Sequence, residues 1–136
     1  MENKITITIN KEVSREILEN IFVTALEGGS NYWYYLSEDA VKLIRSVVSK
    51  EKNPCLSTAI LEAILDHNVE IPINDAEDEE EVLGVLSKKI IQERLQNLAN
   101  SSDYWALERE LSEDRMDAET SDVVFQHLVM GEIVFG

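Results

Sequence analysis

Four consecutive aromatic residues follow a pair of glycines, and they are the side chains best suited to holding a ligand. They are Tyr32, Trp33, Tyr34 and Tyr35. Each ring offers a face on which a base could stack and, for these residue types, a polar tip. The structural alternative is that the rings cover the core, since large aromatics dominate core burial. In an extended segment Tyr32 and Tyr34 share one side and Trp33 and Tyr35 the other, so one pair is expected to face a partner.

A run of acidic residues between positions 75 and 81 is the second candidate for binding. It contributes Asp75, Glu77, Asp78, Glu79, Glu80 and Glu81. Read as a calcium-binding EF-hand loop from Asp75, the sixth position is Glu80 instead of glycine and the twelfth is Leu86, so that pattern fails. The run is expected to open a helix, where the helix dipole favours negative charge. It is also the surface that we expect a basic partner to contact.

Oxygen-bearing side chains gather again near the start of the last predicted helix, at Asp117, Glu119, Thr120 and Asp122. Calcium sites need six or more oxygen ligands and usually a glycine-bearing loop. Helix capping explains the cluster more simply, with Asp117 accepting from the N–H of Glu119 or Thr120 and the other acids favouring the positive end of the dipole. No metal site is predicted here.

No arrangement of residues typical of catalysis is present. The two histidines, His67 and His127, lie in no HExxH motif, and no glycine-rich phosphate-binding loop occurs. Cys55 follows Pro54 without a neighbouring base, which favours a core or inert thiol. The sequence therefore predicts a protein that is not an enzyme and that needs no metal or cofactor.

The charge balance restricts the partners further. The formal net charge is -15, of which residues 69–136 carry -12. Such a surface disfavours direct binding to nucleic acid and to anionic membranes. A cation, a basic protein surface or a groove that normally holds DNA or RNA would be attracted, whereas the plainer interpretation is solubility. The single cysteine and the absence of a signal peptide or an 18-residue apolar run indicate a cytoplasmic protein.

The elements that must position these residues can be read from the spacing of apolar side chains and from caps. A helix is expected after an Asn10 cap, with Gly28 and Gly29 ending it in the left-handed conformation, and another after a Ser37 cap. Further helices are predicted over 57–65, 80–99, 103–111 and 117–130, the last stopped by Gly131.

Three segments read as strands. Residues 4–9 and 69–73 alternate apolar and polar side chains, and Pro72 confines the second to an edge or a bulge. Residues 132–135 are expected to close the chain as a strand in the same sheet as residues 4–9. The sequence thus predicts one α+β domain over residues 1–136, with five to six helices on a small, mostly antiparallel sheet.

Two segments carry a resemblance to known proteins. The first includes the residues EGGSNYWY from Glu27, and the second runs from Asp117 to Gln126 and on through GEIVFG from Gly131. They resemble an EGGSNYWY segment and a DAxTxD…Q…GEIVxG ending in a family of small proteins carried by bacteriophages and prophages. The resemblance covers about a quarter of the chain and implies a phage setting without implying a reaction. The positions that carry it are Glu27, Gly28, Gly29, Asn31, Asp117, Thr120, Asp122 and Gly131.

Three functions follow as hypotheses. The first is an anti-defence inhibitor, directed at a CRISPR or restriction nuclease, whose carboxylates imitate phosphates in a basic groove. The second is a nucleotide or small-molecule binder that uses the aromatic segment to sequester a defence signal, with Arg109 and Arg115 reaching phosphates in a homo-oligomer. The third is a phage assembly or housekeeping factor, in which the acidity only solvates the surface.

Overall fold

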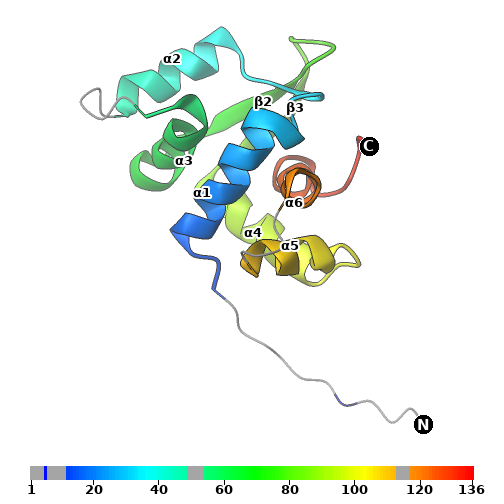
Figure 1. Cartoon of the computed structure of the whole chain (residues 1–136). Coiled ribbons are helices and arrows are strands. Elements are labelled where there is room, and N and C mark those ends of the chain that lie inside the picture. The colour runs from blue at the N-terminus through cyan, green and yellow to red at the C-terminus, as the bar shows by residue number, and fades with distance from the viewer. Residues whose placement is uncertain (1–4, 6–11, 49–53, 113–116) are drawn as a thin grey trace.

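A computed structural model describes residues 5, 12–48, 54–112 and 117–136, and they form helices packed around a small sheet (Figure 1). The sheet has three strands in the order β1-β2-β3, and both pairs are antiparallel. The predicted α+β class is therefore confirmed. The elements are α1 (Arg15–Thr24), the π-helical turn η1 (Ala25–Gly29), β1 (Tyr34–Tyr35), α2 (Glu38–Val47), α3 (Leu56–His67), β2 (Ile71–Asp75), β3 (Val82–Leu86), α4 (Lys88–Ala99), α5 (Tyr104–Leu111) and α6 (Ala118–Met130).

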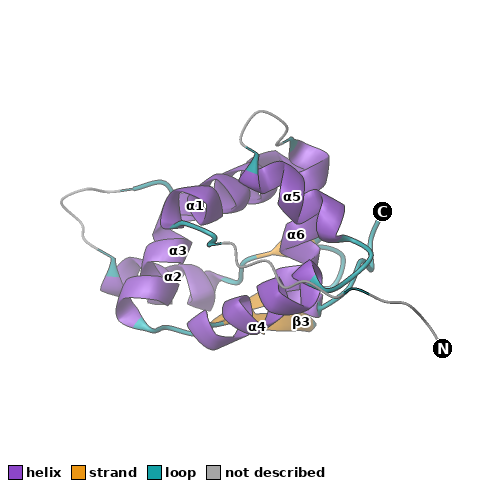
Figure 2. Cartoon of the chain, turned by 90° about the horizontal axis from the view of Figure 1, so that it is seen from below, coloured by secondary structure: helices purple, strands orange, loops and turns teal. Residues whose placement is uncertain are grey.

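Helix α6 lies at the centre of the molecule. It packs against α1, η1, α4, α5 and β3, and Figure 2 shows it between α5 on one side and α4 with β3 on the other. Residues 120–129 are all buried, which is typical of a helix enclosed by other elements. Half of these buried side chains are nevertheless polar: Thr120, Ser121, Asp122, Gln126 and His127. Buried polar groups need hydrogen-bond partners, so α6 organises the elements around it.

Local capping interactions form largely as predicted. Ser37 accepts from the N–H of Ala40 at the start of α2, and Asp117 forms a capping box with Thr120 at the start of α6. Gly131 ends α6 in the left-handed conformation, with φ of 80°. The cap of α1 was predicted wrongly, because Ser14 takes this position and accepts from Ile17; Asn10 lies outside the described residues.

The glycine pair ends the first helical segment, but for a different reason from the one predicted. Neither Gly28 nor Gly29 has a positive φ; both belong to η1, which extends α1 by a π-helical turn. A β-carbon at Gly29 would collide with the carbonyl oxygen of Ala118, whereas one at Gly28 would meet no atom within 4 Å. Gly29 is therefore required for the close approach of η1 to α6.

The acidic run does not open a helix. Asp75 is the last residue of β2, and residues 76–81 form the turn of the hairpin between β2 and β3. Helix α4 begins only at Lys88, where Ser87 caps it by accepting from Ile90. The predicted helix over 80–99 is thus wrong in its first part. The first residues of the predicted helix instead pair with β2 as the antiparallel strand β3. Gly84 lets this strand lie close to α6, since a β-carbon there would collide with the carbonyl oxygen of Val129.

Pro72 lies in β2, the middle strand of the sheet. Strand β1 pairs only with Asn74 and Asp75, so β2 has a strand neighbour on one side alone at Pro72. A register shift between Ile73 and Asn74 follows it directly. The strand is therefore not the edge strand that was one of the two expectations, whereas the register shift beside Pro72 agrees with the other expectation, a bulge.

The chain ends do not form the sheet that was expected. Residues 132–135 are not a strand, so this prediction was wrong. The strand predicted over 4–9 lies outside the described residues apart from Ile5, which is exposed. None of the described helices combines the length and the apolar character that a bilayer crossing would need.

Candidate functional site

The carboxylate of Asp122 is the centre of a buried hydrogen-bond network. Its Oδ1 accepts from Ser30 Oγ and from Trp33 Nε1, both at 2.7 Å. Its Oδ2 accepts from Tyr32 OH at 2.6 Å and from Gln126 Nε2 at 3.1 Å. Four donors thus compensate a charge that would otherwise be costly to bury. Sequence analysis assigned Asp122 to the helix dipole, whereas the structure places it inside the core.

The same network affects Tyr32. Burial of its hydroxyl, together with the hydrogen bond to Asp122, raises the pKa of Tyr32 to about 12. Tyr32 is 49% exposed as a residue, while its hydroxyl is held by the carboxylate of Asp122.

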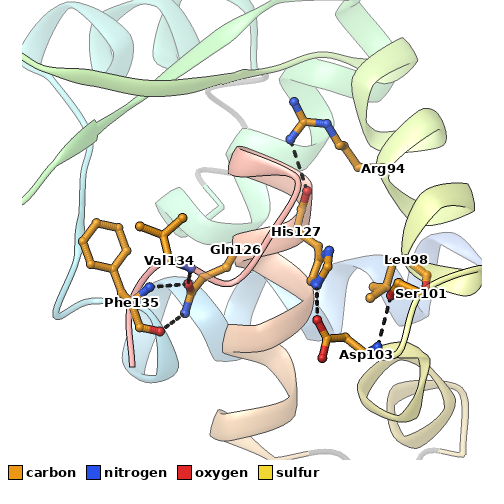
Figure 3. A network of polar contacts seen from close by, with 8 residues as sticks. All are labelled: Arg94, Leu98, Ser101, Asp103, Gln126, His127, Val134 and Phe135. Carbon is orange, nitrogen blue, oxygen red and sulfur yellow. Dashed lines mark hydrogen bonds and ion pairs between the residues drawn. The ribbon is translucent and has the colours of Figure 1, made fainter.

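Gln126 connects this network to the closing segment, which we define as residues 132–136. Its Oε1 accepts from the backbone N–H groups of Val134 and Phe135, and its Nε2 donates to the carbonyl oxygen of Phe135, each at 2.9 Å (Figure 3). A side-chain amide has the same donor and acceptor groups as a peptide unit. Gln126 therefore supplies the backbone partners that a neighbouring strand was expected to supply.

The aromatic segment belongs mainly to the core. Trp33 is 1% exposed and stacks on Phe135, with ring centroids 5.5 Å apart and an interplanar angle of 11°. Phe125 lies 5.6 Å from the same indole ring. Tyr34 is half-buried and donates to the carbonyl oxygen of Leu26 at 2.6 Å, while Tyr35 is half-buried in the strand pair. In this conformation only Tyr32 offers a substantial ring surface to a partner.

The two segments that carry the phage resemblance meet in space. Ser30, Tyr32 and Trp33 come from the first, and Asp122 and Gln126 come from the second. Sequence analysis did not select Ser30 or Gln126, although both lie within the quoted segments. Most of the other motif positions serve the fold. Gly29 permits the close approach of η1 to α6, Asp117 and Thr120 cap the start of α6, and Gly131 ends it.

Three motif positions lie on the surface. They are Glu27, Gly28 and Asn31. Glu27 accepts a hydrogen bond from Ser57 Oγ at 3.1 Å, which joins η1 to the start of α3. A hollow of about 100 Å³ lies beside this contact and is bordered by Tyr34. It is smaller than the roughly 300–1,000 Å³ of typical ligand pockets, so it suits no nucleotide.

Glu110 is a second buried carboxyl group that sequence analysis missed. It is fully buried between α5 and α6, and its Oε1 accepts from Thr120 Oγ1 and Ser121 Oγ, both at 2.7 Å. Its Oε2 has no hydrogen-bond partner among the residues that the structure describes. Burial raises the pKa of Glu110, although the two hydroxyl hydrogen bonds act in the opposite direction.

His127 and Cys55 both form local contacts with neighbouring polar groups. His127 Nε2 lies 2.9 Å from Asp103 Oδ2, and the carbonyl oxygen of His127 accepts from Arg94 Nη1 at 3.3 Å (Figure 3). Cys55 is exposed at the N-cap of α3, so the first of the two predicted alternatives, a core thiol, is wrong, and the second, an inert thiol, stays a prediction. Hydrogen bonds from Ser57 and Thr58 lower the pKa of its thiol.

The acidic hairpin turn, which we call the acidic loop (residues 75–81), presents its carboxylates to solvent. Asp75 Oδ1 accepts from the N–H of Glu77 at 2.8 Å, and Asp78 Oδ1 accepts from the N–H of Glu80 at 3.2 Å. Asn74 Nδ2 also donates to the carbonyl oxygen of Glu79 at 2.7 Å. The aspartates and Asn74 thus fix the backbone of the turn. Residues 77–81 are all exposed, and none forms an ion pair within the part of the chain that the structure describes.

The fold brings the acidic loop next to the aromatic segment. The N–H of Ala76 donates to the carbonyl oxygen of Trp33 at 2.8 Å, and Tyr34 pairs with Asp75 in the sheet. The closing segment, which carries the exposed Ile133 and Val134, is bound by Gln126 and stacks on Trp33 through Phe135. The two predicted binding features are therefore neighbours.

The arginines proposed to reach phosphates are not part of this region. Arg109 lies over the ring of Trp105, with its guanidinium carbon 5.2 Å from the ring centroid. Arg115 lies outside the described residues. Among the described residues no group of three or more histidine, cysteine, aspartate and glutamate side chains could hold a metal ion.

Comparison of the chain with models of protein families, with curated proteins and with solved structures finds no match. Its function is therefore inferred from its own residues.

Proposed function

We propose that this protein acts by binding, without catalysis, and that its acidic loop docks on a basic surface of a partner protein. The observation that carries the proposal is the row of five exposed carboxylates at residues 77–81, which lack a basic partner among the described residues. They stand on a hairpin turn, where a partner can approach from several directions.

The turn is ordered before any partner binds. Asp75 and Asp78 accept backbone hydrogen bonds within the loop, and Asn74 holds the carbonyl oxygen of Glu79. A backbone fixed in this way loses less conformational entropy on binding than a flexible loop would. Complementary charge then raises the association rate and fixes the orientation, and both effects weaken as salt increases.

Affinity also needs an apolar or aromatic anchor, because rim charges contribute little on their own. Tyr32 is the best candidate, since it is 49% exposed and the bond from Ala76 to Trp33 places the neighbouring backbone beside the loop. Ile133 and Val134 are also exposed, and they belong to the closing segment that stacks on Trp33 through Phe135. Trp105 on α5 is also exposed, but the guanidinium of Arg109 lies over its ring.

The partner that fits this chemistry best is a groove that normally holds nucleic acid. Carboxylates in place of phosphates would occupy such a groove, and the resemblance to phage and prophage proteins favours a host defence nuclease. In this proposal the protein is a cytoplasmic anti-defence inhibitor. If the protein is instead an assembly factor whose acidity only solvates the surface, its activity should not depend on the carboxylates of the acidic loop.

The nucleotide-binding alternative receives less support. A base would need a face of Trp33, and Phe135 stacks on this ring while Phe125 packs against it. Replacing Trp33 would therefore not separate the two functions, because loss of a buried tryptophan costs about 3–5 kcal/mol of stability by itself.

A matched pair of charge-reversed variants tests the proposal. In the loop variant, Glu77, Glu79, Glu80 and Glu81 become Lys, which leaves the turn-forming Asp75 and Asp78 unchanged. In the control variant, the exposed Glu12, Glu70, Glu93 and Glu108 become Lys, which changes the net charge equally. Phage plating is measured on cells that carry individual CRISPR or restriction systems.

The expected result is that the wild-type and control proteins protect the phage and the loop variant does not. Equal protection by the loop variant would show that the acidic loop is only solvating. If the wild-type protein protects against none of the systems, the anti-defence role is wrong.

A further inference from the structure

We propose that Gln126 and Trp33 form a peptide-binding site whose resident ligand is the closing segment. The ligand that could replace it is an extended segment of a different protein, with an aromatic side chain at the position of Phe135. The proposal rests on different residues from the acidic loop, so either can fail without the other.

The polar part of the site recognises backbone atoms. All three hydrogen bonds that Gln126 makes to the closing segment involve main-chain groups, namely the N–H groups of Val134 and Phe135 and the carbonyl oxygen of Phe135. Recognition of this kind resembles the addition of a strand to a sheet edge, where main-chain bonds give affinity and pockets give specificity. Any segment with two consecutive free N–H groups could form these bonds.

The hydrogen bond to Asp122 fixes the orientation of the Gln126 side-chain amide. Gln126 Nε2 donates to Asp122 Oδ2 at 3.1 Å, and the other oxygen of Asp122 is held by Ser30 and Trp33. With the nitrogen facing the carboxylate, Oε1 faces the closing segment. The site is therefore preorganised through Asp122, which fixes both the amide of Gln126 and the indole of Trp33 before the ligand binds, and this lowers the cost of binding.

The specific part of the site is the face of Trp33. Phe135 lies on it at 5.5 Å and nearly parallel, and the indole N–H is fixed by Asp122 at 2.7 Å. Stacked aromatic pairs at this separation attract each other beyond the effect of area burial. A segment that brings another aromatic ring to this face would satisfy the site equally well.

The rest of the closing segment is weakly attached. Ile133 is 43% exposed and Val134 is 52% exposed, so their side chains add little buried area. Gly131, with φ of 80°, joins the segment to α6. Segments with few buried apolar contacts open at a lower free energy than the core. The resident ligand can therefore be exchanged without unfolding α6.

The test uses the full chain with Phe135→Ala and a labelled peptide with the sequence of residues 131–136. Because the resident segment competes with the peptide, fluorescence anisotropy should show about tenfold tighter binding to this variant than to the wild-type chain. Ile133→Ala, an exposed position in the same segment, is the matched control and should behave as the wild type. A peptide with alanine at the Phe135 position, or with proline at the Val134 position, should not bind.

The proposal is overturned if the peptide fails to bind the Phe135→Ala chain while circular dichroism shows that chain to be folded. If the variant does not fold, the wild-type chain is titrated with excess peptide and followed by NMR. The amide signals of Val134 and Phe135 and the indole signal of Trp33 should then shift, and unchanged signals would contradict the site. Wild-type dimers that Phe135→Ala dissolves would identify a second copy as the occupant and overturn the assignment to a different protein.

Discussion

A carboxylate surrounded by donors holds several parts of this molecule together. Asp122 receives hydrogen bonds from Ser30, Tyr32, Trp33 and Gln126, which belong to two distant segments of the chain. Hydrogen bonds to a charged group contribute about 1.5–3 kcal/mol, and removing the acceptor leaves buried donors without partners. The stability of the fold should therefore depend on the negative charge of the Asp122 side chain more than on its size.

We predict that Asp122→Asn lowers the free energy of unfolding by about 3 kcal/mol. The new amide group places a donor against groups that are themselves donors, while the side chain keeps its shape. Urea unfolding measures the change, and Glu77→Gln, an exposed carboxylate of the acidic loop, should stay within about 0.5 kcal/mol of the wild type. Equal stability of both variants would show that the buried network contributes little.

The buried Glu110 gives a pH-dependent prediction. Burial raises its pKa in the folded state, while the hydroxyl groups of Thr120 and Ser121 lower it and Asp117 raises it further. A raised folded pKa means that the stabilisation is fully present below the unfolded value of about 4.3 and is lost as the pH rises through the folded value. The wild-type chain should therefore lose stability relative to Glu110→Gln over this pH range.

Urea unfolding of the wild-type chain and of Glu110→Gln between about pH 4 and about pH 8 checks this expectation. The glutamine keeps the Oε1 acceptor for the two hydroxyl groups but cannot ionise. A stability difference between the two proteins that stays constant with pH would contradict it.

The packing of elements against α6 depends on two glycines that lack room for a side chain. Gly29 brings η1 against the start of α6, and Gly84 brings β3 against its end, in each case beside a backbone carbonyl oxygen. Backbone atoms cannot rotate away as a flexible side chain can. The positions of η1 and β3 are therefore set by main-chain contact with the central helix.

Gly28 and Gly29 form a matched pair for this idea. Gly29→Ala should destabilise the protein by about 1–3 kcal/mol, because the new methyl group would collide with Ala118. Gly28→Ala should stabilise it by about 0.5–1 kcal/mol, since the position is helical and open and alanine restricts the unfolded chain. Thermal melts of the two variants measure the difference, and equal melting temperatures would exclude close packing at Gly29.

The molecule as a whole carries far more negative than positive charge. A net charge of -15 on 136 residues causes self-repulsion in the compact state. Among the described residues the exposed ion pairs are few, namely Arg15 with Asp66 and Lys42 with Glu38. Repulsion between exposed charges should therefore dominate over attraction.

We predict that the melting temperature rises when sodium chloride is increased from about 10 mM to about 300 mM, because the Debye length falls over this range from about 30 Å to less than 10 Å. The loop variant with four charge reversals, which carries less net charge, should show a smaller rise. A melting temperature that falls with salt would mean that attractive pairs outweigh the repulsion.

The sequence alone was sufficient to predict the features that depend on residues close to one another in the chain. The caps at Ser37 and Asp117 and the stop at Gly131 follow from a side chain or a backbone conformation acting within one helical turn. The α+β class and most helix positions follow from apolar spacing. The acidic loop was recognised as a candidate binding surface for the same reason, since its six carboxylates are adjacent in the chain.

The tertiary structure alone decided the features that join distant segments. The acidic run looked like a helix start because its local charge suits a helix dipole, but pairing with β2 and contact between Gly84 and α6 make it a hairpin. Residues 132–135 looked like a strand, but the side chain of Gln126 supplies their backbone partners. Asp122 looked like a surface acid until Ser30, Tyr32 and Trp33 were brought to it across about 90 residues. Local patterns cannot predict such contacts, because each depends on which segments the central helix brings together.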